Sequence, residues 1–210
     1  MLPLFERLYA RHRIYRLGSQ FAAARLAAAR AEIERGATVY LAGIAIGGMH
    51  NSGVALVETS RQGGIRLICN HEEERFSGKK HTAEFPRNAL DALVETTGRL
   101  GIERDRIAAW LGTWDYPAFL STLIRAFAEE LPASFDLLRL NSLPTFSLRH
   151  TAEGVFAADE LGRRLGAGGP LPIIAMPHHE NHAWFSFSAS PFARSKTPVL
   201  IAVLDGMGDR

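Results

Sequence analysis

The stretch VYLAGIAIGGMHNSGVALVE, residues 39–58, holds two apolar runs separated by a glycine-rich connection. Residues 39–46 are a continuous apolar run with β-branched members, which is typical of a buried strand. The connection GGMHNSG predicts a tight loop, residues 54–58 predict a second strand, and RQGG predicts a hairpin turn before a third strand at 65–72. The domain is therefore expected to open with three strands joined by short loops.

Helices and strands are expected to alternate after this opening. Periodicity and turn signals predict helices at 86–101, 115–131, 151–165 and 178–190, and strands at 107–114, 173–176 and 199–205, the last of them buried. This order is that of one lobe of the two-lobed fold of actin, the sugar kinases and the heat-shock-chaperone ATPases. We therefore expect an α/β first lobe over residues 39–210, with a mixed sheet and flanking helices. Because a strand, an aspartate and a glycine loop at the end of the chain have the form that opens a second lobe, we expect a fragment.

Residues 1–38 differ from the rest of the chain in charge, with seven arginines against three acids. The alanine-rich stretch FAAARLAAARAEIERG, which ends at Gly36, predicts a helix within 4–35. Arginine recurs among its apolar positions, so we expect a basic amphipathic face. A solvated appendage packed on the domain is the favoured interpretation of this N-terminal helical extension, and contact with a membrane surface or a partner is the alternative.

Composition excludes several classes of protein. The net charge is +2 over 210 residues and the basic excess is local, which argues against a nucleic-acid partner. No apolar run reaches the length of about 18 residues that a membrane span needs, and charges near the N-terminus interrupt any signal-peptide core. The single cysteine, Cys69, allows no intrachain disulfide and is expected to be a small buried hydrophobe rather than a nucleophile. We expect a cytoplasmic protein, with a homodimer as one open state of assembly.

The strongest chemical signal is the pair His178 and His182. They stand four apart on a predicted helix, so both imidazoles share one face and can reach one metal ion. The spacing is that of the metalloprotease helix HExxH, but Glu180 lies in the wrong position for that enzyme's glutamate, so a protease is not expected. His179 adds an imidazole on a neighbouring face. The alternative is a pair of surface or hydrogen-bonded histidines.

A second signal is Asp205, at the end of the predicted strand VLIAVLD. A carboxylate in this position can ligate a metal or orient a substrate, and the following Gly206 and Gly208 can present backbone N–H groups to phosphate. Asp209 is a weaker candidate of the same kind. The alternative is an ordinary carboxylate at a strand-to-turn junction.

Two further segments hold candidate ligand-binding residues. Backbone amides of the loop GGMHNSG, which contains His50, can cradle a phosphate, although most such loops are simple tight turns. The segment HEEERFSGKKHTAEFP, residues 71–86, follows a predicted strand and carries Lys79, Lys80 and His81, which can bind an anionic substrate. A solvated run of charges is the alternative for this segment.

Taken in order, these segments resemble the O-carbamoyltransferases of nodulation-factor and antibiotic biosynthesis. In that family a loop similar to GGMHNSG precedes a strand like VALVE, and a segment like EEERFSGKKHTAEFP follows. A His-His-x-x-His-Ala segment comes next, here HHENHA, and then a Ser-Pro-Phe, here residues 190–192. A strand ending in Asp-Gly-x-Gly-Asp/Glu, here DGMGD, completes the set. The resemblance runs from about residue 40 to residue 210.

The resemblance implies a transferase of biosynthesis. In the family, a separate C-terminal domain makes carbamoyl adenylate from carbamoyl phosphate and ATP, which brings Mg²⁺ as a cofactor. The N-terminal domain, similar to the threonylcarbamoyl-transfer protein for tRNA, then moves the carbamoyl group to a hydroxyl of a sugar or secondary metabolite. A divalent metal, iron in the family, is held by two histidines that match His178 and His182. Asp205 matches the family's aspartate at the metal and adenylate site, and His50 lies where the family's loop has its histidine. We take His50 as a hypothetical general base.

Two departures from the family pattern bear on these expectations. The family usually has His-Asp in the first loop, whereas this chain has His50–Asn51, and asparagine cannot act as a base. The second lobe and the carbamoyl-adenylate domain also have no counterpart in these 210 residues, so we expect the chain alone to be inactive. Two alternatives stay open. One is a non-catalytic lobe that needs another chain, and the other is a sugar-kinase-like phosphotransferase, against which a metal held by the two histidines would argue.

Overall fold

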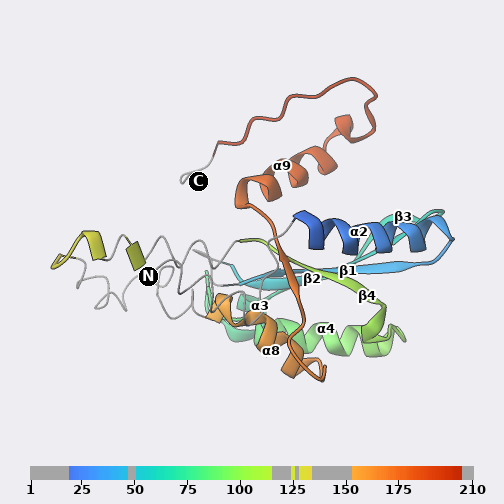
Figure 1. Cartoon of the computed structure of the whole chain (residues 1–210). Coiled ribbons are helices and arrows are strands. Elements are labelled where there is room, and N and C mark those ends of the chain that lie inside the picture. The colour runs from blue at the N-terminus through green and yellow to red at the C-terminus, as the bar shows by residue number, and fades with distance from the viewer. Residues whose placement is uncertain (1–18, 47–50, 115–123, 126–127, 134–152, 205–210) are drawn as a thin grey trace.

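A five-stranded mixed sheet forms the centre of the protein. The computed structural model describes residues 19–46, 51–114, 124–125, 128–133 and 153–204 (Figure 1). Within these ranges the strand order is β3-β2-β1-β4-β5. Strands β1, β2 and β3 pair antiparallel, whereas β4 runs parallel to both β1 and β5. The strands are β1 (Val39–Ala45), β2 (Gly53–Ser60), β3 (Gly64–Glu72), β4 (Ile107–Gly112) and β5 (Ile173–Ala175).

Helices flank this sheet on both faces. Figure 1 shows α4 and α8 together on one face and α2 on the opposite face. The helices are α2 (Ser19–Glu34), α3 (Glu73–Ser77), α4 (Arg87–Arg99), α8 (Ala157–Arg164) and α9 (His178–Ala189), with short 3₁₀ turns η1 (Arg104–Arg106) and η2 (Pro191–Arg194). The architecture is the α/β arrangement that the sequence predicts, with a mixed sheet and flanking helices, and it is consistent with one lobe of the ATPase-like fold.

The core lies between the sheet and the helices α4 and α8. Leu90 and Leu93 from α4 and Leu161 from α8 pack in one cluster with Ile44 of β1 and Leu56 of β2, and all five are at most 1% exposed. Burial of each such side chain contributes about 1.5–3 kcal/mol relative to the exposed state. This cluster is therefore the main source of stability for the sheet and the two helices.

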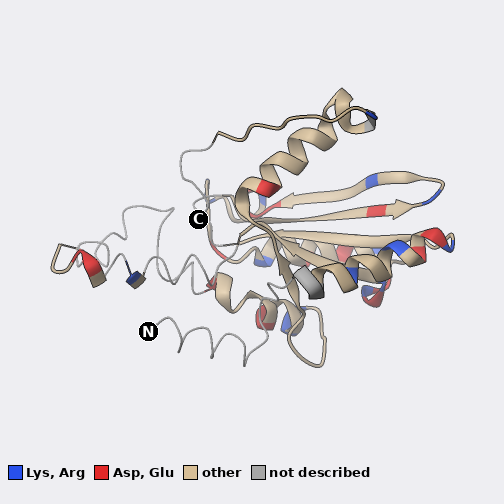
Figure 2. Ribbon diagram, turned by 45° about the horizontal axis from the view of Figure 1, so that its top comes forward, with Lys and Arg blue, Asp and Glu red and all other residues tan. Residues whose placement is uncertain are grey.

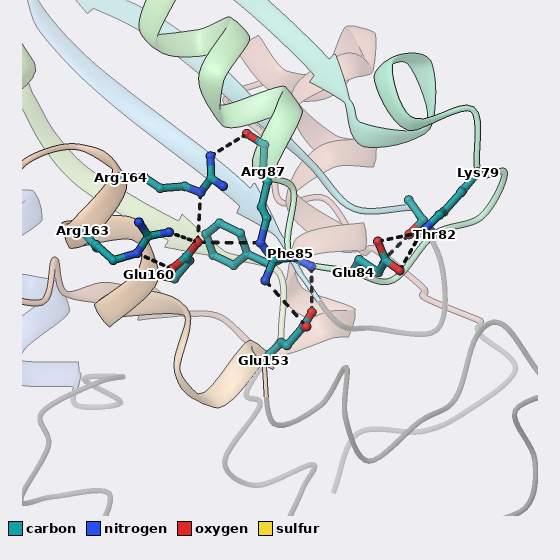
Figure 3. A network of polar contacts seen from close by, with 9 residues as sticks. All are labelled: Lys79, Thr82, Glu84, Phe85, Arg87, Glu153, Glu160, Arg163 and Arg164. Atoms are coloured by element: carbon teal, nitrogen blue, oxygen red, sulfur yellow. Dashed lines mark hydrogen bonds and ion pairs between the residues drawn. The ribbon is translucent and has the colours of Figure 1, made fainter.

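A network of polar contacts fixes α8 against α4 and the segment before it (Figure 3). Arg164 of α8 forms ion pairs with Asp91 of α4 at 2.8 Å and with Glu160 at 2.9 Å. Glu153 accepts a hydrogen bond from the backbone N–H of Phe85 at 3.1 Å and lies 3.7 Å from Arg87. Helix α8 and the turn preceding it therefore fix the end of segment 71–86, which carries the predicted ligand-binding residues Lys79, Lys80 and His81.

The opening of three strands is confirmed, as are the helices predicted at 86–101 and 178–190. The helix predicted at 151–165 is interrupted, because Phe156 forms a turn and α8 begins at Ala157. Most of the helix predicted at 115–131 lies outside the described residues. Strand β4 ends at Gly112 rather than at residue 114.

The buried strand predicted at 199–205 is wrong for the residues that the structure describes. Residues 199–204 adopt no strand, and the side chains of Leu200 and Leu204 are 95% and 97% exposed. The apolar, β-branched composition of this segment gives it a preference for extended backbone. A strand also needs a neighbour that completes its hydrogen bonds, and composition does not supply one.

The basic amphipathic face predicted for the N-terminal helix is also wrong for its described part. Helix α2 begins at Ser19, and the residues before it lie outside the description. Among residues 22–34 only Ala29 is buried, while Leu26 is 42% exposed. The side chains from Ala22 to Glu34 are mostly exposed on every side of the helix, so no continuous buried apolar stripe forms in this part. In the described part of the chain, moreover, no helix combines the length and apolar content that crossing a membrane requires.

The last described segment differs from the rest in its packing. We call residues 178–204 the arm, which comprises α9, η2 and the extended chain that follows. Helix α9 has no buried residue, and Figure 1 shows the arm leaving the end of β5 and extending away from the helices that cover the sheet. Figure 2 shows the arm almost free of charged residues. The arm therefore carries few charges and exposes several large apolar side chains, among them Phe185, Leu200 and Leu204.

Candidate functional site at one edge of the sheet

The strand register brings the predicted site segments to one edge of the sheet. Gly53 at the start of β2 pairs with both Ala45 of β1 and Glu72 of β3, and Gly112 at the end of β4 pairs with Ala175 of β5. The loop before β2, the segment after β3 and the residues that follow β4 and β5 consequently all leave the sheet at the same edge. We call it the site edge. In sheets with parallel strands, ligands bind at the carboxyl ends of those strands, which here are β1, β4 and β5.

Close packing against β3 explains why the last residue of the loop GGMHNSG, Gly53, is a glycine. A Cβ atom at this position would lie 2.7 Å from the backbone oxygen of His71 on the neighbouring strand, so only glycine fits. Glycine here lets β2 and β3 approach closely where the site edge begins. His50 and the two glycines at 47 and 48 lie outside the described residues.

Asn51 and His81 join the loop before β2 to the segment after β3. Both residues have a positive φ, 58° and 54°, a conformation that is uncommon for residues other than glycine. The Nδ1 atom of His81 lies 3.1 Å from Oδ1 of Asn51, and the backbone N–H of Ser52 donates to the carbonyl of Thr82 at 2.9 Å. The N–H of His81 donates to the Glu74 carboxylate at 3.1 Å. These contacts hold two strained residues side by side, as is common at functional sites.

The charged segment 71–86 is largely neutralised within itself. The Lys79 ammonium lies 3.0 Å from the Glu84 carboxylate, and Arg75 pairs with Glu72. Lys80 is exposed and, among the described residues, its ammonium makes no hydrogen bond or ion pair. Of the three predicted anion-binding residues, Lys80 and the ring of His81 are therefore better placed to bind a ligand than Lys79.

Glu73 has a structural role in the same segment. Its side chain is 3% exposed, and its carboxylate accepts hydrogen bonds from the side chain of Asn88 and from the backbone N–H of Ala89, at 2.9 Å. Both donors lie in the first turn of α4, where backbone N–H groups have no partner within the helix. The carboxylate therefore satisfies the N-terminus of α4 and fixes the short helix α3 to it.

His178 and His182 lie together at the other end of the site edge. Their Nε2 atoms are 3.0 Å apart and their rings meet edge to face, with centroids 4.4 Å apart. The prediction that both imidazoles share one face of a helix is confirmed. This separation suits a hydrogen bond between one protonated and one unprotonated nitrogen, and it equally suits two lone pairs directed at one ion.

The described residues supply part of a possible metal site. Imidazole nitrogens are common ligands of divalent metals, and these two lie close enough to reach one ion. Within the described ranges, no group of three His, Cys, Asp or Glu side chains could hold a metal. The pair therefore offers two candidate ligands, and a complete site would need further ones.

Contacts to the end of β4 fix the first turn of α9. The backbone N–H of Met176 donates to the carbonyl of Gly112 at 3.3 Å, and the side chain of Asn181 donates to the carbonyl of Thr113 at 3.2 Å. The indole of Trp114 is stacked on the imidazole of His178. The histidine pair is therefore attached to the sheet although the rest of α9 is exposed.

Three further predicted site residues lie outside the described residues, and Cys69 lies within them. Asp205, Gly206 and Gly208 follow the last described residue, so their places are not part of the described structure. Cys69 is half-buried in β3, and burial raises the pKa of its thiol. The thiol form is therefore favoured at neutral pH, in agreement with the expectation that Cys69 is no nucleophile.

The sequence pattern does not predict the contacts that Trp114, Asn181 and Asn51 make at the site edge. The sequence predicts Trp114 as the last residue of a strand, and it predicts that Asn51 can form hydrogen bonds but cannot act as a base, without indicating its partner. The available signal was position, because polar and aromatic residues directly after a buried strand lie at the edge of a sheet. At the site edge, the start of β2 and the end of β5 are three strand spacings, or roughly 14 Å, apart.

Comparisons with known proteins find distant relatives of the chain. No family model matches the chain. The chain is 30% identical over 162 residues to the nodulation protein NolNO of Sinorhizobium fredii, covering 77% of this chain and 20% of that protein. It is 26% identical over 169 residues to the uncharacterised protein sll1178 of Synechocystis, covering 76% of this chain and 24% of that protein. The chain thus spans about a fifth to a quarter of the length of these relatives and is distantly related to NolNO.

Proposed function

We propose that this chain is part of an O-carbamoyltransferase and supplies the metal-binding half of the site where a carbamoyl group passes to a hydroxyl. The relation to a nodulation protein supports the proposal, because the motifs of the chain resemble O-carbamoyltransferases of the nodulation type. The observation that carries it is the pair His178 and His182, with Nε2 atoms 3.0 Å apart at the site edge. Asp205 is proposed as a further metal ligand.

The proposed reaction takes carbamoyl adenylate, made elsewhere from carbamoyl phosphate and ATP with Mg²⁺, as the donor. The hydroxyl oxygen of a sugar or another small metabolite forms a bond to the carbamoyl carbon, and the bond between that carbon and the phosphate oxygen breaks. AMP leaves with the electron pair of that bond, and the hydroxyl proton passes to a base, for which His50 is the proposed residue. A divalent ion, iron by the resemblance, would supply Lewis-acid polarisation when bound.

The described residues have distinct proposed roles in this reaction. His178 and His182 hold the ion, and Lys80 and His81 bind anionic oxygen atoms of the donor at the other end of the site edge. Lys79 is a weaker participant because Glu84 neutralises it. Gly206 and Gly208 are proposed to donate backbone N–H groups to the adenylate phosphate.

Carbamoyl transfer can be tested with the donor generated in the reaction mixture. The chain would be combined with carbamoyl phosphate, ATP, Mg²⁺, iron and the adenylate-forming domain of an O-carbamoyltransferase, and a panel of sugars would be screened by mass spectrometry for an added carbamoyl group. Binding of AMP to the chain would be measured by calorimetry in parallel.

The proposal expects Lys80→Ala to weaken AMP binding roughly ten- to hundredfold, the range of about 1.5–3 kcal/mol that a charge-assisted hydrogen bond supplies. Arg61→Ala is the matched control, because Arg61 is an exposed cation in the hairpin turn at the opposite edge of the sheet. If the wild-type chain gave no carbamoylated product and bound no AMP, the proposal would be contradicted.

A lobe that acts only together with another chain or segment is the second candidate. The exposed apolar side chains of the arm favour it, since Phe185 is 76% and Leu200 is 95% exposed. Metal and AMP binding without carbamoyl transfer in the experiment above would favour this second candidate over an active enzyme.

A further inference from the structure

The indole of Trp114 lies flat against the imidazole of His178. The two ring centroids are 3.8 Å apart and the ring planes differ by 13°. Trp114 follows the end of β4, and His178 is the first residue of α9 after β5, so the contact joins the ends of two neighbouring strands. We propose that Trp114 is a positioning residue, which holds the ring of His178 in the orientation that directs its Nε2 atom toward His182. The inference rests on the metal site of the proposed function.

Trp114 and His182 restrict rotation of the His178 ring in different ways. Trp114 covers one face of the ring by stacking, and His182 meets it edge to face with an interplanar angle of 76°. The second torsion angle of a histidine side chain has a broad distribution, so an unsupported ring would sample many orientations. Rotation of the ring about this torsion would lose the stack and would also turn Nε2 away from His182. The stack thus orders a metal ligand before the metal binds.

The backbone around this contact is fixed independently of the indole. The hydrogen bonds from Met176 to Gly112 and from Asn181 to Thr113 join the same two segments on either side of the ring contact. Removal of the indole therefore leaves α9 attached to β4, and its effect falls on the orientation of the His178 ring. Groups that orient a metal ligand without touching the metal commonly change metal affinity ten- to hundredfold.

Trp184 provides a matched control on the same helix. It lies two residues after His182 and is 58% exposed. Its indole meets the ring of Phe187 edge to face, with ring centroids 6.2 Å apart. Substitution of Trp184 removes an indole of the same size from α9 and leaves the His178 stack intact. A difference between Trp114 and Trp184 variants therefore reports the stack rather than the general loss of an aromatic residue.

The test compares the wild-type chain with Trp114→Leu, Trp114→Phe and Trp184→Leu, each titrated with Fe²⁺ or Co²⁺ alone by calorimetry. Trp114→Leu is expected to raise the dissociation constant for the metal roughly ten- to hundredfold. Trp114→Phe is expected to lose less, because a phenyl ring can still stack, and Trp184→Leu is expected to bind as wild type does. Co²⁺ should quench the fluorescence of the wild type and Trp184→Leu more strongly than that of the Trp114 variants, because bound Co²⁺ lies beside the stacked indole.

A structural readout separates positioning from unfolding. The His178 ring protons are expected to carry the ring-current shift of the indole in NMR spectra of the wild type and to lose it in Trp114→Leu, while the circular dichroism of the two proteins stays alike. Equal metal affinity in Trp114→Leu and the wild type would overturn the inference and leave the proposed function standing. Equal loss in Trp184→Leu would also overturn it, and no metal binding by the wild-type chain would overturn both.

Discussion

Apolar side chains are buried between the sheet and its covering helices but exposed in the arm. Leu161 of α8 and Ile173 of β5 are fully buried, whereas Phe185 and Leu200 of the arm are largely exposed. The two regions meet at the Trp114–His178 stack. Stability therefore resides in the layer between the sheet and helices α4 and α8, while the proposed chemistry lies where this stable part meets a segment that contributes little to folding.

The largest expected difference between the two regions is the cost of removing a leucine. Leu161→Ala is expected to lower the free energy of unfolding by about 2–5 kcal/mol, because it leaves a cavity in the core. Leu200→Ala, in the arm, is expected to change it by less than about 0.5 kcal/mol. Urea unfolding measures both values. A similar loss in the two variants would contradict the division into a stable sheet region and an unsupported arm.

Two glycines in the helices that cover the sheet are expected to respond to alanine in opposite directions. A Cβ atom on Gly162 of α8 would lie 2.1 Å from the backbone oxygen of Gly169, so Gly162→Ala is expected to destabilise the protein by about 1–3 kcal/mol. A Cβ atom on Gly98 of α4 would meet nothing within 4 Å, so Gly98→Ala is expected to stabilise it by up to about 1 kcal/mol. Thermal unfolding of both variants tests this, and destabilisation by Gly98→Ala would show that α4 is less regular than described.

At the site edge, Asn51 allows backbone strain to be separated from a side-chain contact. Its φ of 58° is easily adopted by glycine, whereas alanine adopts it only at a cost in free energy. Both substitutions remove the side-chain contact to His81. Asn51→Ala is therefore expected to be less stable than Asn51→Gly by about 1 kcal/mol. Equal stabilities in urea unfolding would contradict the strained conformation at this position.

The smallest expected effect concerns the polar network between α4 and α8. The hydrogen bond from Arg163, supported by Arg164, lowers the pKa of Glu160 below its ordinary value of 4.5. A carboxyl with a lowered folded pKa contributes stability above the unfolded pKa and loses it as the pH falls through the folded pKa. Between pH 5 and about pH 3 the wild type is therefore expected to lose slightly more stability than Glu160→Gln. Thermal unfolding across this range checks it, and a steeper loss in Glu160→Gln would contradict it.

Local patterns in the sequence predict most of the sheet and helices but few of the contacts at the site. Apolar runs and glycine turns predict β1, β2 and β3 because alternation and turn chemistry act over a few residues. The helical spacing of four likewise places His178 and His182 on one face. The contacts of Trp114 with His178 and of Asn51 with His81 depend on strand order and register, which no local pattern encodes. Residues 199–204 show the converse case, in which a strong local preference for strand lacks a partner strand.

The central claim is that His178 and His182 hold one metal ion at the site edge. The direct measurement is the stoichiometry and affinity of Fe²⁺ or Co²⁺ binding to the wild-type chain and to His178→Ala, His182→Ala and His179→Ala. His179 is the control, because it is a histidine of the same helix on a neighbouring face, and its ring meets that of His178 edge to face with centroids 5.9 Å apart. The account predicts one ion per chain, lost in His178→Ala and His182→Ala and retained in His179→Ala. Equal binding by all four proteins, or no binding by the wild type, would contradict it.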